Sequence, residues 1–149
     1  MAKSTVPVVA SFMTESPHSI GRSQTLTKAH EIMRANRIRH LPVLDGGKLV
    51  GMVSQRDLHL IESLSDVQAD TVQVDEAMVQ LPYAVPPDAP LDEVVQEMSE
   101  RRYGSAVVME HGKIVGVFTT TDARRVLAQM LRDGAVVKAP KTKAPARGD

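Results

Sequence analysis

The feature that most constrains the fold is an internal duplication, because the chain aligns with itself without a gap when it is displaced by 65 residues. Met13 then aligns with Met78 and Asp57 with Asp122, and most of the aligned positions between them hold residues of similar chemical type. A repeat of only ~55 residues rarely buries enough apolar surface to be stable alone. The sequence therefore predicts two small units that share a core.

Both copies show the same order of elements. In the first copy, Leu26, Ala29, His30 and Met33 have the spacing of one helix face, and residues 91–98 repeat that spacing with Pro90 in the first turn. A short extended piece precedes each helix, at residues 19–20 and 84–85. This helix pattern places one amphipathic helix early in each repeat.

Two short apolar runs follow each helix. They are separated by residues 45–47 in the first copy and 110–112 in the second, where Gly and Asp favour the positive φ of a tight turn. A further helix is expected to start at Asp57 in the first copy and at Asp122 in the second. Each repeat thus reads β-α-β-β-α, which gives an α+β fold class.

The duplication also sets the predicted boundaries. We expect an N-terminal arm at residues 1–7, a first repeat at 8–64, a linker at 65–72 and a second repeat at 73–132. Residues 133–149 are rich in Ala, Pro, Lys and Gly without periodicity, so they are expected to form a disordered tail.

Composition excludes several classes of function. Lys plus Arg and Asp plus Glu are both 18, so the chain has no net field for steering nucleic acid or an anionic membrane. There is no cysteine, no apolar run of the ~20 residues needed to cross a bilayer, and no signal-peptide pattern. We therefore expect a cytoplasmic protein with no membrane segment and no specific nucleic-acid binding.

Catalytic and metal chemistry have no clear basis in the sequence. The five histidines lack paired ligand spacing, and His30 falls on a predicted core face. No Ser-His-Asp or Cys-His set is suggested, so the chain is not expected to be an enzyme and no metal site is predicted.

The most informative segments are the two strand-to-helix junctions, residues 51–57 and 116–122. Both read Gly, two apolar residues, a hydroxyl residue, two others and Asp. A helix N-terminus with hydroxyls attracts phosphate, and a nearby carboxylate can accept hydrogen bonds from ribose hydroxyls. The alternative is that Ser54 and Thr119 cap their helices while Asp57 and Asp122 complement the helix dipole. Both interpretations stay open.

The ordered motifs resemble those of CBS domains. Met13-Thr14 comes first, then Leu26 with its amphipathic helix, then residues 38–43, and finally residues 51–57, and the set recurs in the second copy. The resemblance covers about residues 8 to 130. It implies two repeats related by pseudo-twofold symmetry and packed through their sheets, with two clefts between them, and it implies a homodimer.

Residue by residue, the resemblance implies that Asp57 and Asp122 bind ribose hydroxyls and that Ser54 and Thr119 face phosphate or ribose. It also implies that clefts borrow residues from both repeats. In the second copy Gly104, Ser105 and Val107 replace Arg39, His40 and Pro42, which weakens the case for phosphate binding there. The predicted site of the first repeat comprises Ser19, Ile20, Ile38, Arg39, His40, Pro42, Ser54, Arg56 and Asp57, and that of the second comprises Ala84, Val85, Tyr103, Gly104, Ser105, Thr119, Thr121 and Asp122.

Basic residues gather in the first repeat near the predicted cleft. Guanidinium groups suit phosphate oxygens, so this is the favoured phosphate site. For Arg34 and Arg37, the alternative interpretation is that they lie on a solvated helix face. The cluster comprises Arg34, Arg37, Arg39, His40 and Arg56.

The sequence thus predicts a regulatory module that binds AMP, ADP or ATP as a ligand, requires no cofactor, and acts on an effector protein in trans. One alternative is a structural dimerisation module with empty clefts. Another is that the ligand is S-adenosylmethionine or a different adenosyl compound, because a ribose-binding aspartate does not distinguish these ligands.

Overall fold

The computed structural model describes residues 6–16 and 18–134, and these residues form an α+β fold of two similar units. The predicted β-α-β-β-α order is confirmed in both repeats. The first comprises β2 (Ile20–Gly21), α1 (Leu26–Asn36), β3 (His40–Asp45), β4 (Lys48–Ser54) and α2 (Gln55–Glu62), and the second comprises β6 (Ala84–Val85), α3 (Leu91–Arg101), β7 (Ser105–Glu110), β8 (Lys113–Thr119) and α4 (Thr120–Arg132).

Each repeat begins with a short segment that lies on the other unit. A 3₁₀ turn η1 (Val9–Ser11) and strand β1 (Thr14–Glu15) begin the first repeat, and η2 (Val74–Glu76) and β5 (Val79–Gln80) begin the second. One sheet has the order β2-β3-β4-β5 and the other has β1-β8-β7-β6, so β1 and β5 are exchanged between the units. The repeats as they run in the sequence are therefore not the packing units.

The exchange explains the glycine in each junction motif. A Cβ at Gly116 would lie 2.8 Å from the carbonyl oxygen of Thr14 on β1, and a Cβ at Gly51 would lie 2.9 Å from that of Val79 on β5. Real Cβ atoms do not approach a backbone oxygen so closely, so only glycine lets the exchanged strand pair at this register.

The hairpins close with two-residue turns. Gly46 and Gly47 have φ of 58° and 85°, and His111 and Gly112 have φ of 52° and 75°. Two successive positive φ values match the right-handed twist of the flanking strands. The turns are one residue shorter than the predicted loops, because Asp45 and Glu110 pair within the strands.

The helices begin earlier than the sequence suggested. α2 starts at Gln55 rather than Asp57, and α4 starts at Thr120 rather than Asp122, because Ser54 and Thr119 end their strands as N-caps. Pro90 is the N-cap of α3, one position before the first turn. These shifts place both aspartates at the third helical position.

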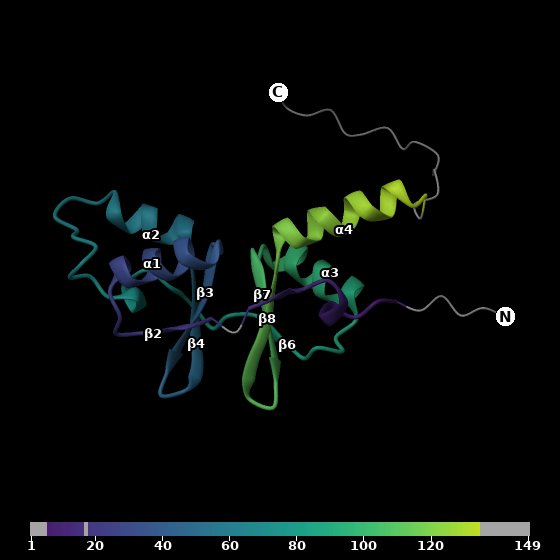
Figure 1. The fold of residues 1–149 in the computed structure, drawn as a ribbon, viewed down its shortest axis with the longest axis horizontal. Helices are drawn as coiled ribbons and strands as arrows, with labels where there is room; N and C mark the ends of the chain where they lie inside the picture. The colour runs from purple at the N-terminus through teal and green to yellow at the C-terminus, as the bar shows by residue number, and fades with distance from the viewer. Residues whose placement is uncertain (1–5, 17, 135–149) are drawn as a thin grey trace, which may run out of the picture.

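Two cores form, one under each sheet, and a third cluster joins the units. Leu26, Ala29 and Met33 of α1 are buried in the first core, while His30 is only half-buried. The joining cluster is centred on Met52, Val107 and Val117, which come from β4, β7 and β8. The two units are thus packed through their sheets, and Figure 1 shows the two hairpins adjacent at the middle of the molecule.

Other expectations concern parts of the chain outside this description. Residues 1–5 of the predicted arm and 135–149 of the predicted tail lie outside the described residues.

Within the described ranges, no helix has the length and apolar character that a bilayer span requires. The same residues contain no group of three or more His, Cys, Asp or Glu side chains arranged to hold a metal ion.

Candidate functional site

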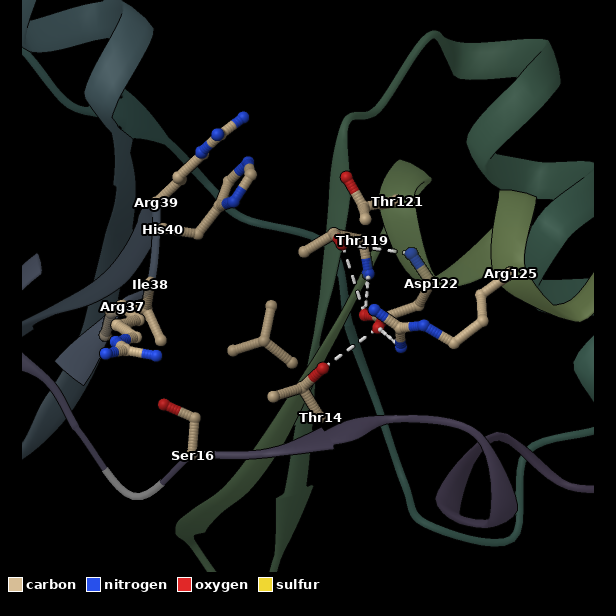
Figure 2. A pocket seen from close by; sticks show the side chains of 11 residues that line it. Thr14, Ser16, Arg37, Ile38, Arg39, His40, Thr119, Thr121, Asp122 and Arg125 are labelled. Carbon is tan, nitrogen blue, oxygen red and sulfur yellow. Dashed lines mark hydrogen bonds and ion pairs between the residues drawn. The ribbon is translucent and has the colours of Figure 1, made fainter.

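A cavity of about 280 Å³ lies between the two repeats. One wall comes from the α1–β3 connection of the first repeat, and the other comes from the β8–α4 junction of the second (Figure 2). The exchanged segment around β1 contributes the edge between them. The lining side chains are those of Thr14, Ser16, Arg37, Ile38, Arg39, His40, Val117, Thr119, Thr121, Asp122 and Arg125.

Asp122 is the buried anchor of this cavity, with 2% of its surface exposed. Its Oδ2 accepts hydrogen bonds from the backbone N–H of Thr119 at 2.8 Å and from the Thr119 hydroxyl at 3.1 Å. Its Oδ1 accepts from the hydroxyl of Thr14 and from Nη1 of Arg125, each at 2.9 Å. Because all these partners are present, the carboxylate is stable in an otherwise unfavourable buried position.

The junction motif therefore acts as a capping box in both copies. Thr119 accepts a hydrogen bond from the N–H of Asp122, and Ser54 accepts one from the N–H of Asp57 while its own N–H donates to Asp57 Oδ2 at 2.9 Å. The capping interpretation of the motif is thus realised in the structure. Since the Asp122 cap also faces a cavity, capping and ligand binding are compatible there.

The opposite wall is cationic. Arg37 has left-handed φ of 54° at the end of α1, which turns the chain so that the next three residues run along the cavity. The carbonyl of Arg39 accepts a hydrogen bond from the N–H of Gln55 at 2.9 Å, which ties this connection to the start of α2. With Arg125 from the other wall, three guanidinium groups line a cavity that contains one carboxylate.

His40 adds a neutral polar group to this wall. Burial lowers the pKa of His40, and the positive charge of Arg39 lowers it further, while the carboxylates of Asp57 and Asp122 act in the opposite direction. Burial is the largest of these causes, so the imidazole is neutral near pH 7.

Ser16 supplies an unsatisfied polar atom. Its side chain is buried, with 4% of the residue exposed, and among the described residues its Oγ has no hydrogen-bond partner. Buried hydroxyls are nearly always paired, so an unpaired one on a cavity wall points to a partner that occupies the cavity.

The structure groups the predicted site residues across the repeats. Ile38, Arg39 and His40 of the first repeat share the cavity with Thr119, Thr121 and Asp122 of the second. None of the other predicted residues lines this cavity. Those remaining residues are Ser19, Ile20, Pro42, Ser54, Arg56, Asp57, Ala84, Val85, Tyr103, Gly104 and Ser105.

Several of these remaining residues have structural environments of their own. Ile20 and Val85 are buried in the two cores, Pro42 is buried within β3, and Tyr103 stacks on Tyr83 with ring centroids 5.2 Å apart. Ala84 lines a separate cavity. Their assigned ligand contacts stay predictions.

The predicted basic cluster is divided in the same way. Arg37, Arg39 and His40 line the cavity between the repeats. Arg34 instead lines a groove between α1 and α2, together with His30, whose Nε2 lies 2.6 Å from Glu62 Oε2. Arg56 is exposed and lines neither.

The symmetry-related positions around Asp57 are more apolar. Val79 stands where Thr14 does and is 58% exposed, and Leu81 stands where Ser16 does and is 89% exposed. Gly104 and Ser105 replace Arg39 and His40. The two repeats therefore have chemically different residues around Asp57 and Asp122, although the order and pairing of their elements match.

Four lining residues were not predicted from the sequence: Thr14, Ser16, Val117 and Arg125. Thr14 and Ser16 reach the cavity only because β1 pairs with β8 rather than with the first repeat. Arg125 lies three residues after Asp122 on the same helix face, a spacing that could have identified it.

Comparison with known families settles the fold family of this chain. The family model for the CBS domain matches residues 9–61 and 74–129. The chain belongs to the CBS domain family. The two matched segments correspond to the two repeats, so the cavity lies between the members of a CBS domain pair.

Related CBS proteins share this architecture. A putative acetoin utilization protein (AcuB) from Vibrio cholerae is 31% identical, with a TM-score of 0.71 over 91% of this chain and 100% of that one. CBSX2, whose structure is a complex with AMP, is 25% identical, with a TM-score of 0.68 over 83% of this chain and 97% of that one. Hypoxic response protein 1 from Mycobacterium tuberculosis is 28% identical over 111 residues, which are 74% of this chain and 78% of that protein.

Some relatives are much longer. The chain is 26% identical over 126 residues to L-aspartate semialdehyde sulfurtransferase from Methanocaldococcus jannaschii, but it spans only 24% of that protein. Because the match covers so small a part of that enzyme, its catalytic activity is not inferred for this CBS pair.

Proposed function

We propose that this CBS pair is a regulatory module that binds one adenine nucleotide, AMP, ADP or ATP, in the cavity between the repeats. The observation that carries the proposal is one cavity lined by a buried carboxylate, Asp122, on one wall and by the side chains of Arg37 and Arg39 on the opposite wall. A carboxylate suits ribose hydroxyls, and guanidinium groups suit phosphate oxygens.

The parts of the ligand match the parts of the cavity. The ribose lies at Asp122, the phosphate lies toward Arg37 and Arg39, and the base lies between the apolar side chains of Ile38 and Val117. The unpaired hydroxyl of Ser16 gains a partner in the bound state. The AMP complex of CBSX2 supports an adenine nucleotide as the ligand class.

The position of the cavity gives a route for regulation. Its walls belong to different repeats, so a ligand that contacts both favours one relative position of the two units. A ligand can bias a partner protein only through different affinities for two such states. We therefore propose that the nucleotide changes the surface that an effector protein recognises in trans.

An alternative function is dimerisation without a ligand. Exposed apolar side chains favour association of some kind, among them Leu60, Leu64, Val79 and Leu81. A homodimer is compatible with nucleotide binding, so the two functions differ in whether the cavity is occupied.

Thermal unfolding with a ligand panel separates these functions. The protein is heated with AMP, ADP, ATP or S-adenosylmethionine, each at about 1 mM. A ligand present at 100 times its dissociation constant adds about 2.7 kcal/mol, which raises the Tm by several degrees for a chain of this size. A rise with an adenine nucleotide supports the proposal, a rise with S-adenosylmethionine alone reassigns the ligand, and no rise with any of them favours the dimerisation module.

A further inference from the structure

The starting observation is that Asp122 has no acceptor capacity left. A carboxylate has about four lone-pair sites. Oδ2 accepts two hydrogen bonds from Thr119, and Oδ1 accepts one from Thr14 and one from Arg125. The hydroxyls of a ribose can therefore reach this carboxylate only if one of the present donors leaves.

Arg125 is the donor that can leave most easily. The Thr119 N–H belongs to the capping box, the Thr119 hydroxyl is fixed beside Asp122 because it also accepts the capping bond from the Asp122 N–H, and Thr14 is held by the pairing of β1 with β8. The side chain of Arg125 is 66% exposed, and its contact with Asp122 is its only hydrogen bond within the described part of the chain. Figure 2 shows the guanidinium folded back over the carboxylate at the edge of the cavity.

The other repeat lacks this arrangement. Leu60 stands where Arg125 does, and it cannot donate a hydrogen bond to Asp57. Among the described residues, Asp57 Oδ1 accepts no hydrogen bond, whereas the equivalent atom of Asp122 accepts two. The guanidinium cover is thus specific to the Asp122 cavity.

A displaced Arg125 remains beside the ligand. It lines the same cavity as Arg37 and Arg39, so its guanidinium can pair with an anionic group of the ligand after leaving Asp122. A nucleoside offers ribose hydroxyls but no anion, so its binding removes the cation from Asp122 without giving it a new partner. A nucleotide supplies the phosphate that restores the pairing.

We infer that Arg125 is a specificity-determining residue that covers the ribose acceptor Asp122 in the free protein and moves to the phosphate when a nucleotide binds. This inference rests on the proposed nucleotide function. It predicts selection of nucleotides over nucleosides by competition at Asp122, in addition to simple charge attraction.

The test compares AMP with adenosine by isothermal titration calorimetry on the full chain. Arg125→Ala should weaken AMP binding about tenfold because a charge-assisted pair is lost, and it should strengthen adenosine binding several-fold because the competitor is gone. Arg125→Leu introduces the residue found at position 60 and should show the same opposite changes. Arg124→Ala removes an equal charge from an exposed neighbour that does not line the cavity, and it should change both affinities less than about twofold.

The outcomes separate the two claims. If the wild type binds AMP and Arg125→Ala changes both affinities in the same direction, the inference is wrong while the nucleotide function stands. The same holds if Arg124→Ala reproduces the effect, because charge alone then explains it. If the wild type binds none of adenosine, AMP, ADP and ATP, the proposed function fails and the inference fails with it.

Discussion

The hydroxyl of Thr14 donates a 2.9 Å hydrogen bond to Asp122, 108 residues further along the chain. The bond exists because β1 crosses from the start of the first repeat to the edge of the second sheet. It joins the exchanged strand to the buried carboxylate that anchors the cavity. Stability and the candidate site are therefore linked through this contact.

Removing this bond should destabilise the protein. Thr14→Val places at position 14 the residue that occupies the equivalent position 79, and it leaves one lone pair of a buried carboxylate unsatisfied. We expect a loss of about 2 kcal/mol in the free energy of unfolding, measured by urea denaturation. Val79→Thr is the matched control, and it should stay within about 0.5 kcal/mol of the wild type. An unchanged unfolding midpoint for Thr14→Val would contradict this role for the bond.

The two junction glycines should differ in their effect on the site. Gly116→Ala and Gly51→Ala both place a Cβ against the exchanged strand, so each should cost about 1–3 kcal/mol of stability. Only Gly116→Ala displaces β1 and with it Thr14 and Ser16. We therefore expect weaker AMP binding for Gly116→Ala and near wild-type binding for Gly51→Ala at a temperature where both are folded. Equal losses of affinity would show that the cavity does not depend on β1.

The left-handed backbone conformation of Arg37 should lower the free energy of unfolding. It has φ of 54° at the end of α1, and Arg102 has φ of 60° at the end of α3. Glycine adopts this conformation without steric penalty, so Arg37→Gly and Arg102→Gly should each stabilise the protein by about 1 kcal/mol. Only Arg37→Gly should weaken AMP binding, because Arg102 does not line the cavity. Unchanged AMP affinity for Arg37→Gly would exclude its phosphate role.

Acid should weaken the fold partly through His40. Its folded-state pKa is lowered by burial, so the unfolded chain binds a proton near the ordinary pKa of about 6.5 while the folded chain does not. The stability from this group is fully present above pH 6.5 and is lost as the pH falls toward the folded-state pKa. Between pH 7 and pH 5, the wild type should lose more stability in urea denaturation than His40→Gln, a comparison in which the other histidines cancel. Parallel losses for the two proteins would show that His40 is not the responsible group.

Local patterns in the sequence predicted much of the fold. The spacing of Leu26, Ala29 and Met33 identified a buried helix face, and the glycines at 46 and 47 identified a tight hairpin turn, because both signals depend on neighbours in the chain. Helix starts were predicted two residues late at Asp57 and Asp122. The capping residues Ser54 and Thr119 lie three residues before the aspartates. The motif alone does not show that each helix begins directly after its capping residue.

The composition of the site was only partly predictable. Ile38, Arg39, His40 and Asp122 were identified through the CBS resemblance, which implied clefts that borrow residues from both repeats but did not indicate that these four residues line one cavity. Strand β1 has only two residues and no periodicity, so nothing local indicates that it pairs with β8. The contributions of Thr14 and Ser16 follow from that tertiary pairing and could not be read from their neighbours.

The most direct test of ligand binding in the Asp122 cavity is isothermal titration calorimetry with AMP on three proteins: the wild type, Asp122→Asn and Asp57→Asn. The amide keeps the shape of the side chain in each capping box, so the two variants are matched for the helix cap. We predict one site per chain in the wild type, a loss of affinity of at least about tenfold for Asp122→Asn, and no such loss for Asp57→Asn. Binding that survives Asp122→Asn, or that is lost only with Asp57→Asn, would contradict the assignment of the ligand to the Asp122 cavity.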